Sequence, residues 1–140
     1  MRRCTICLLV LCLSLLVSSA AAQNPEKEKV AIAAAEQWLS FVDSGGYGQS
    51  WMEAAEYFRN AITKEKWVQS LNAVRNPLGK LISRDLKSAI YATSLPGAPD
   101  GEYVVIYFDT SFGNKKTAIE TVTPVLEKDG RWRVSGYYIK

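Results

Sequence analysis

The spacing of the apolar residues changes once along this chain, near Asn76-Pro77, and that change constrains the fold more than any other feature. Before it, apolar residues recur every three or four positions, as on one face of a helix; after it, they alternate, as in strands. A block of helices followed by a block of strands is typical of an α+β fold. The spacing predicts three N-terminal helices packed on one face of a curved four-stranded antiparallel sheet. The helices are expected at about 25–42, 48–58 and 63–74, and the strands at about 81–93, 102–112, 116–127 and 131–139.

Cap and turn residues mark several of these boundaries. Asn24-Pro25 is a favourable helix start, because asparagine caps free amides and proline suits the first helical position. Gly45-Gly46 ends that helix, and Asp129-Gly130 predicts a hairpin turn. Pro124 inside the third strand predicts a bulge, an edge position or an early end of the strand. Alternation in the first strand places Ile82, Leu86 and Ile90 on the same face as Arg84.

Residues 1–22 have the pattern of a secretory signal peptide. Arg2-Arg3 precedes an apolar run from Ile6 to Val17, and Ala20-Ala21-Ala22 forms a cleavage signal before Gln23. A membrane anchor would need about 20 apolar residues, and no small residue precedes a cysteine as lipoprotein processing requires. We therefore expect cleavage, a single domain over 23–140 without a membrane span, and export to the periplasm or, alternatively, full secretion.

Cleavage would remove all three cysteines, and the chain has no histidine. We therefore expect no disulfide, no cofactor, and no zinc, copper or haem site, since their usual ligands are missing. Asp100 and Glu102 could contact calcium, but turn chemistry explains them better. Without Arg2 and Arg3 the charge is 15 − 14 = +1, which gives no basic face for nucleic acid.

Four stretches resemble a bacterial secreted family known only as domain-of-unknown-function family 4019. They are EQWLSFVDSGGYGQSW (36–51), LNAVRNPLGK (71–80), YATSLPGAPDGEYVVI (91–106) and ETVTPVLEKDGRWRVSGYYI (120–139). That family is similar in plan to the nuclear-transport-factor-two-like, or cystatin-like, superfamily, whose curved sheet wraps helices into a cone with a pocket. The resemblance implies a fold and a compartment but no activity, since such folds host enzymes and binding modules alike.

Carboxylate acid–base chemistry is the one catalytic class that the residues of 23–140 leave open. Some enzymes of the cone fold, the ketosteroid isomerase type, use a buried carboxylate and a tyrosine, because an apolar pocket raises a carboxyl pKa. Asp109 and Glu120 are the candidates, on hairpin-linked strands near Tyr103. Arg84 and Arg133 could pair with them. The alternative is a solvated face with cross-strand ion pairs.

Aromatic side chains are abundant, with four tryptophans and seven tyrosines. Most of the tryptophans fall at positions expected for core packing. The candidates for a ligand-binding rim are the tyrosines outside the most apolar stripes, Tyr57, Tyr91, Tyr103 and Tyr137.

The loop 94–101 is the candidate partner contact. Its sequence SLPGAPDG restricts chain freedom, which lowers the entropy cost of ordering it on binding. The residues expected to contact a partner are Leu95, Pro96, Pro99 and Asp100. The alternative is a stiff connection between two strands.

Export, the lack of reactive side chains and the aromatic content together favour a non-enzymatic module of the bacterial envelope. Such a module would bind a small molecule or an envelope protein. The alternative is a cofactor-free enzyme with Asp109 or Glu120 as its base. Homodimerisation through the open face of the sheet is compatible with either function.

Overall fold

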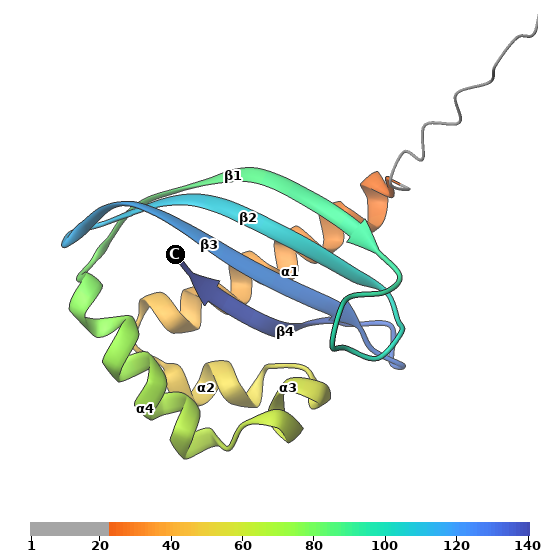
Figure 1. Cartoon of the computed structure of the whole chain (residues 1–140), viewed down its shortest axis with the longest axis horizontal. Helices are drawn as coiled ribbons and strands as arrows, with labels where there is room; N and C mark the ends of the chain where they lie inside the picture. Colours follow the sequence, from red (N-terminus) through yellow and green to blue (C-terminus); the bar gives the residue numbers. More distant parts are fainter. Residues whose placement is uncertain (1–22) are drawn as a thin grey trace, which may run out of the picture.

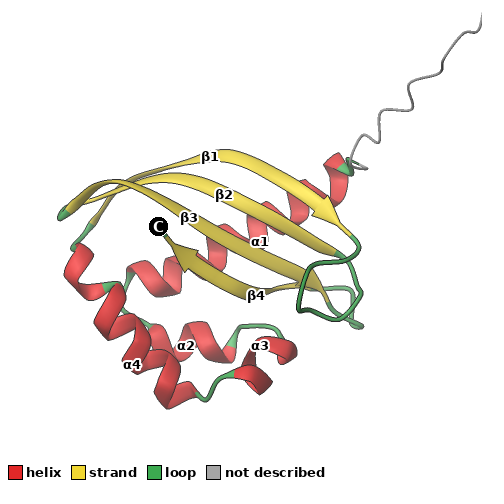
Figure 2. Ribbon diagram, in the orientation of Figure 1, coloured by secondary structure: helices red, strands yellow, loops and turns green. Residues whose placement is uncertain are grey.

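The structure is a computed structural model that describes residues 23–140; the expected signal peptide at 1–22 lies outside the described residues. Figures 1 and 2 show a helical part followed by a sheet. The elements are α1 (Pro25–Asp43), α2 (Tyr47–Met52), α3 (Glu56–Ala61), α4 (Lys64–Val74), the 3-10 helix η1 (Asn76–Leu78), β1 (Leu81–Ala92), β2 (Tyr103–Phe112), β3 (Lys115–Leu126) and β4 (Trp132–Ile139).

The four strands form one antiparallel sheet in the order β1-β2-β3-β4, so each strand pairs with the next along the chain. The sheet curves, α1 lies along its inner face, and α2, α3 and α4 gather on the β4 side (Figure 1). The predicted α+β arrangement is confirmed. Within residues 23–140, no helix combines the length and apolarity that a membrane crossing needs.

The expected second helix is two short helices in the structure, α2 and α3. The chain between them is extended at Ala55, and the Ala55 amide donates to the Val134 carbonyl of β4 at 2.8 Å. Ala54 and Ala55 are both fully buried. A contact with the sheet therefore replaces the helical hydrogen bond, which the local sequence pattern could not show.

Strand β1 departs from simple alternation. Its pairing with β2 shifts between Leu81 and Ser83 and again between Leu86 and Ser88. An extra residue at such a bulge reverses which side chains face the core. Ile82, Leu86 and Ile90 are exposed, whereas Arg84 reaches the buried Glu120 and the partly buried Asp43. The predicted shared face of β1 is therefore wrong for Ile82 and Ile90, whereas Leu86 stays on the face of Arg84, because no register shift separates the two and they pair with the buried Phe108 and Thr110. The bulge predicted at Pro124 is confirmed, since the β3–β4 register shifts there.

Two tryptophans of the core are anchored at one serine. The Trp67 indole donates to the Ser50 hydroxyl at 2.9 Å, and the Trp38 indole donates to the Ser50 carbonyl at 2.8 Å. Ser50 itself is fully buried and donates to the Tyr47 carbonyl at 2.6 Å. This contact fixes α1, α2 and α4 relative to one another, because each supplies one partner.

Replacing Ser50 with alanine should destabilise the fold by about 2 kcal/mol, because a buried indole N–H loses its acceptor. The matched control is Ser70→Ala, since Ser70 is exposed and its hydroxyl bonds only within α4; we expect a change within about 0.5 kcal/mol. Urea unfolding measures both. If the Ser50→Ala and Ser70→Ala variants were equally stable, the Ser50 contact would not hold the three helices together.

Candidate functional site

Glu120 is the most deeply buried charged residue of the chain that the structure describes, with 0% of its surface exposed. Its Oε1 accepts hydrogen bonds from Arg84 Nε and Thr110 Oγ1, both at 2.7 Å. Its Oε2 accepts from Arg84 Nη2 at 3.2 Å and from the Tyr137 hydroxyl. Both carboxylate oxygens are thus occupied by donors from three other strands.

The cluster extends to the end of α1. The Arg84 guanidinium also donates to both oxygens of Asp43, at 2.8 and 2.9 Å. Arg75, which is buried, lies 3.4 Å from Asp43 and stacks over the Phe112 ring at 4.3 Å from its centroid. Two acidic and two basic side chains therefore balance inside the fold, which is the condition for burying charges at tolerable cost.

The charged states of this cluster reinforce one another. Burial alone would lower the pKa of Arg84, but its hydrogen bonds to Asp43 and Glu120 outweigh burial and raise it. Burial and the neighbouring charge of Glu120 raise the pKa of Tyr137. Tyr137 therefore stays protonated over the physiological range and acts as a hydrogen-bond donor to the carboxylate.

The two candidate catalytic carboxylates lie in different environments. Glu120 faces the interior, whereas Asp109 is exposed on the outer face of the sheet, with 60% of its side chain accessible and Lys87 at 3.9 Å. The expected pairing of Arg84 holds for Glu120. Arg133 pairs with neither candidate, and no site in the structure brings Asp109 and Glu120 together.

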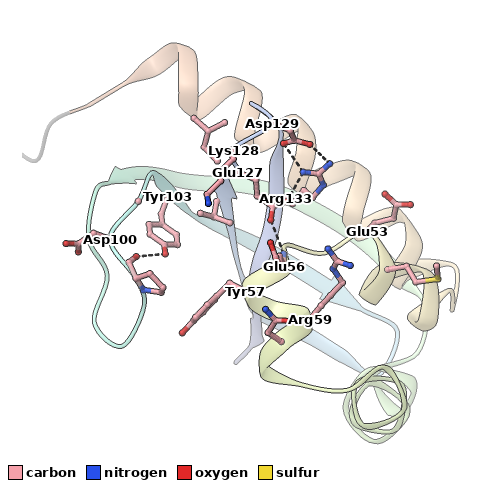
Figure 3. Close-up of a pocket in the computed structure, with 16 residues that line it drawn as sticks. Glu53, Glu56, Tyr57, Arg59, Asp100, Tyr103, Glu127, Lys128, Asp129 and Arg133 are labelled. Carbon is pink, nitrogen blue, oxygen red and sulfur yellow. Dashed lines mark hydrogen bonds and ion pairs between the residues drawn. The ribbon is translucent and has the colours of Figure 1, made fainter.

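An open groove of about 840 Å³ lies between α2 and α3 on one side and the loop 99–101 with the β3–β4 hairpin on the other (Figure 3). Two of the predicted ligand-binding residues, Tyr57 and Tyr103, line it, together with Pro99 and Asp100 of the predicted partner loop. Most of its remaining lining is charged: Glu53, Glu56, Arg59, Glu127, Lys128, Asp129 and Arg133.

Both groove tyrosines hold the loop. The Tyr57 hydroxyl donates to the Gly97 carbonyl at 3.0 Å, and the Tyr103 hydroxyl donates to the Pro99 carbonyl at 2.6 Å. Within the loop, the Ala98 amide donates to Leu95 and the Gly101 amide to Thr93. Burial raises the pKa of Tyr103, and the nearby Tyr57 and Asp100 add to this. The loop is therefore fixed at one wall of the groove.

On the same side of the groove as the loop, the β3–β4 hairpin contributes a set of ion pairs. Arg133 donates to Glu127 at 2.7 Å and to Asp129 at 2.8 Å, shown as dashed lines in Figure 3. Glu127 also accepts from the Glu56 amide at 2.9 Å, which ties the hairpin to α3. The hydrogen bonds from Arg133 and the Arg131 amide lower the pKa of Asp129 to about 2.

The remaining predicted site residues lie elsewhere. Tyr91 donates to Glu102 at 2.7 Å, and Glu102 pairs with Lys27 near the start of α1. Tyr137 belongs to the buried cluster, where its ring packs on Trp38 at a centroid distance of 5.3 Å. Leu95 and Pro96 belong to the same loop as Pro99 but do not line the groove. The four predicted tyrosines therefore lie at three separate places: two at the loop, Tyr91 at Glu102, and Tyr137 in the buried cluster.

Sequence reasoning did not find Asp43, Arg75 or Thr110, which complete the buried cluster. Asp43 ends α1 and Arg75 ends α4, positions that normally face water, and only the packed structure brings them to Arg84. Arg84 itself was visible as a basic residue in an otherwise apolar alternation. Among residues 23–140, no group of three or more acidic, cysteine or histidine side chains is placed to hold a metal ion.

Comparison with known protein families gives a match over most of the described chain. Residues 34–137 match the family model described as "Protein of unknown function (DUF4019)". The chain belongs to the DUF4019 family. None of the curated proteins matches it. The match confirms the family resemblance from the sequence, and it covers both the buried cluster and the groove.

Replacing Glu120 with glutamine should destabilise the protein by about 3 kcal/mol, because it leaves part of the Arg84 charge buried without a partner. The control is Asp109→Asn, which removes an exposed carboxylate and should change stability by less than about 1 kcal/mol. Urea unfolding of both variants provides the comparison. A Glu120→Gln variant as stable as the control would contradict the role assigned to the cluster.

Replacing Tyr57 with phenylalanine removes one of the two hydroxyls that hold the loop. Hydrogen exchange at the Ala98 and Gly101 amides should become about fivefold faster, in line with the loss of one ordinary hydrogen bond. The control is Tyr138→Phe, since Tyr138 is exposed on β4 and lies outside the groove. Unchanged exchange in the Tyr57 variant would mean that the loop is held by its own backbone contacts.

Proposed function

We propose that this DUF4019 protein is a non-enzymatic interaction module of the bacterial cell envelope, and that a partner protein docks in the groove beside Tyr57. The observation that carries the proposal is the groove itself, with its loop already fixed by two tyrosine hydroxyls. The envelope location rests on the leader pattern of residues 1–22.

The shape and lining of the groove favour a protein over a small molecule. Sites for small molecules are enclosed, mostly apolar, and cover most of the ligand surface. This groove is open along its length and carries eight charged side chains. An extended segment of a partner could lie along it and contact both walls at once. Tyr57 stays 43% exposed, and tyrosine is enriched where proteins bind each other.

The fixed loop lowers the cost of such binding. Ordering a flexible loop on association opposes affinity, whereas a loop that is already held contributes its surface at little entropy cost. Pro96 and Pro99 restrict the free chain, and the hydroxyls of Tyr57 and Tyr103 hold its carbonyls in the unbound protein. The wall that would meet the partner is therefore present before the partner arrives.

The enzymatic alternative has one contact in its favour, the hydrogen bond between Tyr137 and Glu120. A general base must reach a proton of its substrate. Glu120 has no exposed surface and both of its oxygens already accept hydrogen bonds, while Asp109 faces solvent on the outer face of the sheet. The accessible residues thus support binding better than proton transfer.

A photo-crosslinking amino acid tests the proposal in the native host. Placed at Lys128 in the groove, it should yield a defined adduct with a partner protein, and Tyr57→Ala should weaken that adduct. Placed at Lys87, on the outer face of the sheet, it should yield none. An adduct only at Lys87 would contradict the groove assignment, and its mass would show whether a second copy of the chain binds there instead.

A further inference from the structure

The groove differs in charge from the rest of the protein. Its lining holds five acidic and three basic residues, a balance of 3 − 5 = −2. Residues 23–140 as a whole carry 15 − 14 = +1, so the part outside the groove carries +3. Acidic side chains are therefore concentrated at a groove that also presents an exposed tyrosine.

Only part of this negative charge is neutralised within the groove. Arg133 is paired with Glu127 and Asp129. Glu53, Glu56 and Asp100 take part in no ion pair among residues 23–140. These three carboxylates remain available to charges that a partner brings. Arg59 and Lys128 likewise take part in no ion pair among residues 23–140, and Arg59 directs its Nε to the Ala54 carbonyl at 3.2 Å, so the unpaired side chains of the groove are three acidic and two basic.

The free carboxylates are spread along the groove. In Figure 3, Asp100 and Glu53 lie at opposite ends, with Tyr57 and Glu56 between them. A guanidinium can stack on an aromatic ring while its N–H groups donate to a carboxylate. The exposed Tyr57 ring next to separated carboxylates provides both contacts for side chains that project from an extended segment.

We infer that the segment bound in the groove is basic, an extended stretch of a partner protein with arginine or lysine side chains spaced along it. The inference rests on the proposed function and specifies its partner. Opposite charges across an interface increase the association rate and exclude wrongly charged partners, more than they increase final affinity. Binding should therefore weaken as salt rises and shortens the screening length.

Three synthetic peptides test the inference against the purified protein, expressed from the full chain. One alternates arginine with serine, one alternates glutamate with serine, and one alternates glutamine with serine. The first should shift the amide resonances of Glu56, Tyr57 and Asp100 in NMR titrations, and the other two should not. Asp100→Asn should weaken the arginine peptide about two- to fivefold, the range of one exposed ion pair, and Asp109→Asn should leave it unchanged.

Each other outcome overturns the inference in a recognisable way. Equal shifts with all three peptides would show that the groove binds extended chains without regard to charge, which leaves the proposed function standing. Shifts only with the glutamate peptide would assign the opposite partner, with Lys128 and Arg59 as its contacts. No shift with any peptide would reject a basic segment, and the crosslink at Lys128 then decides separately whether a partner uses the groove.

Discussion

The burial of Glu120 is the constraint on which the rest of the structure depends. A carboxylate with no exposed surface is tolerated only when donors surround it, and here they come from β1, β2 and β4. Arg84 can be one of them because bulges in β1 turn it inward. Its own charge then needs Asp43, and Asp43 also draws in Arg75. One acidic residue thus fixes the relation of the sheet to the ends of α1 and α4.

This arrangement also decides where function can reside. The inner face of the curved sheet carries the charged cluster together with Trp38 and the apolar core. An accessible groove lies at the rim, where α3, the loop 94–101 and the β3–β4 hairpin meet. There Tyr57 and Tyr103 each donate a hydrogen bond from their hydroxyl to a backbone carbonyl of the loop.

Local patterns predicted what local physics controls. The start of α1 at Asn24-Pro25, the extent of α4 and the ends of the four strands follow from capping and periodicity, and the structure has them close to the expected positions. Arg84 was predicted as a partner of Glu120, but the bulges of β1, the break at Ala55 and the contacts of Glu120 with Thr110 and Tyr137 were out of reach, because each depends on a contact with a segment distant in sequence. Tyr57 and Pro99 were predicted separately, and only the fold places them in one groove.

The contrast between the two charged regions carries the functional argument further. Inside the fold, the acidic and basic side chains match one for one, since any unpaired charge there would destabilise the protein strongly. At the groove, Glu53, Glu56 and Asp100 form no ion pair with any described residue. Because water reaches these carboxylates, the lack of an ion-pair partner costs the fold little stability and adds none. Local effects account for part of this, since Glu56 lies in the first turn of α3 and Glu53 accepts a hydrogen bond from Gln49, but they give no reason to gather five acidic side chains beside an exposed tyrosine and a fixed loop. Recognition of an oppositely charged segment does, because steering acts on charges that solvent still reaches.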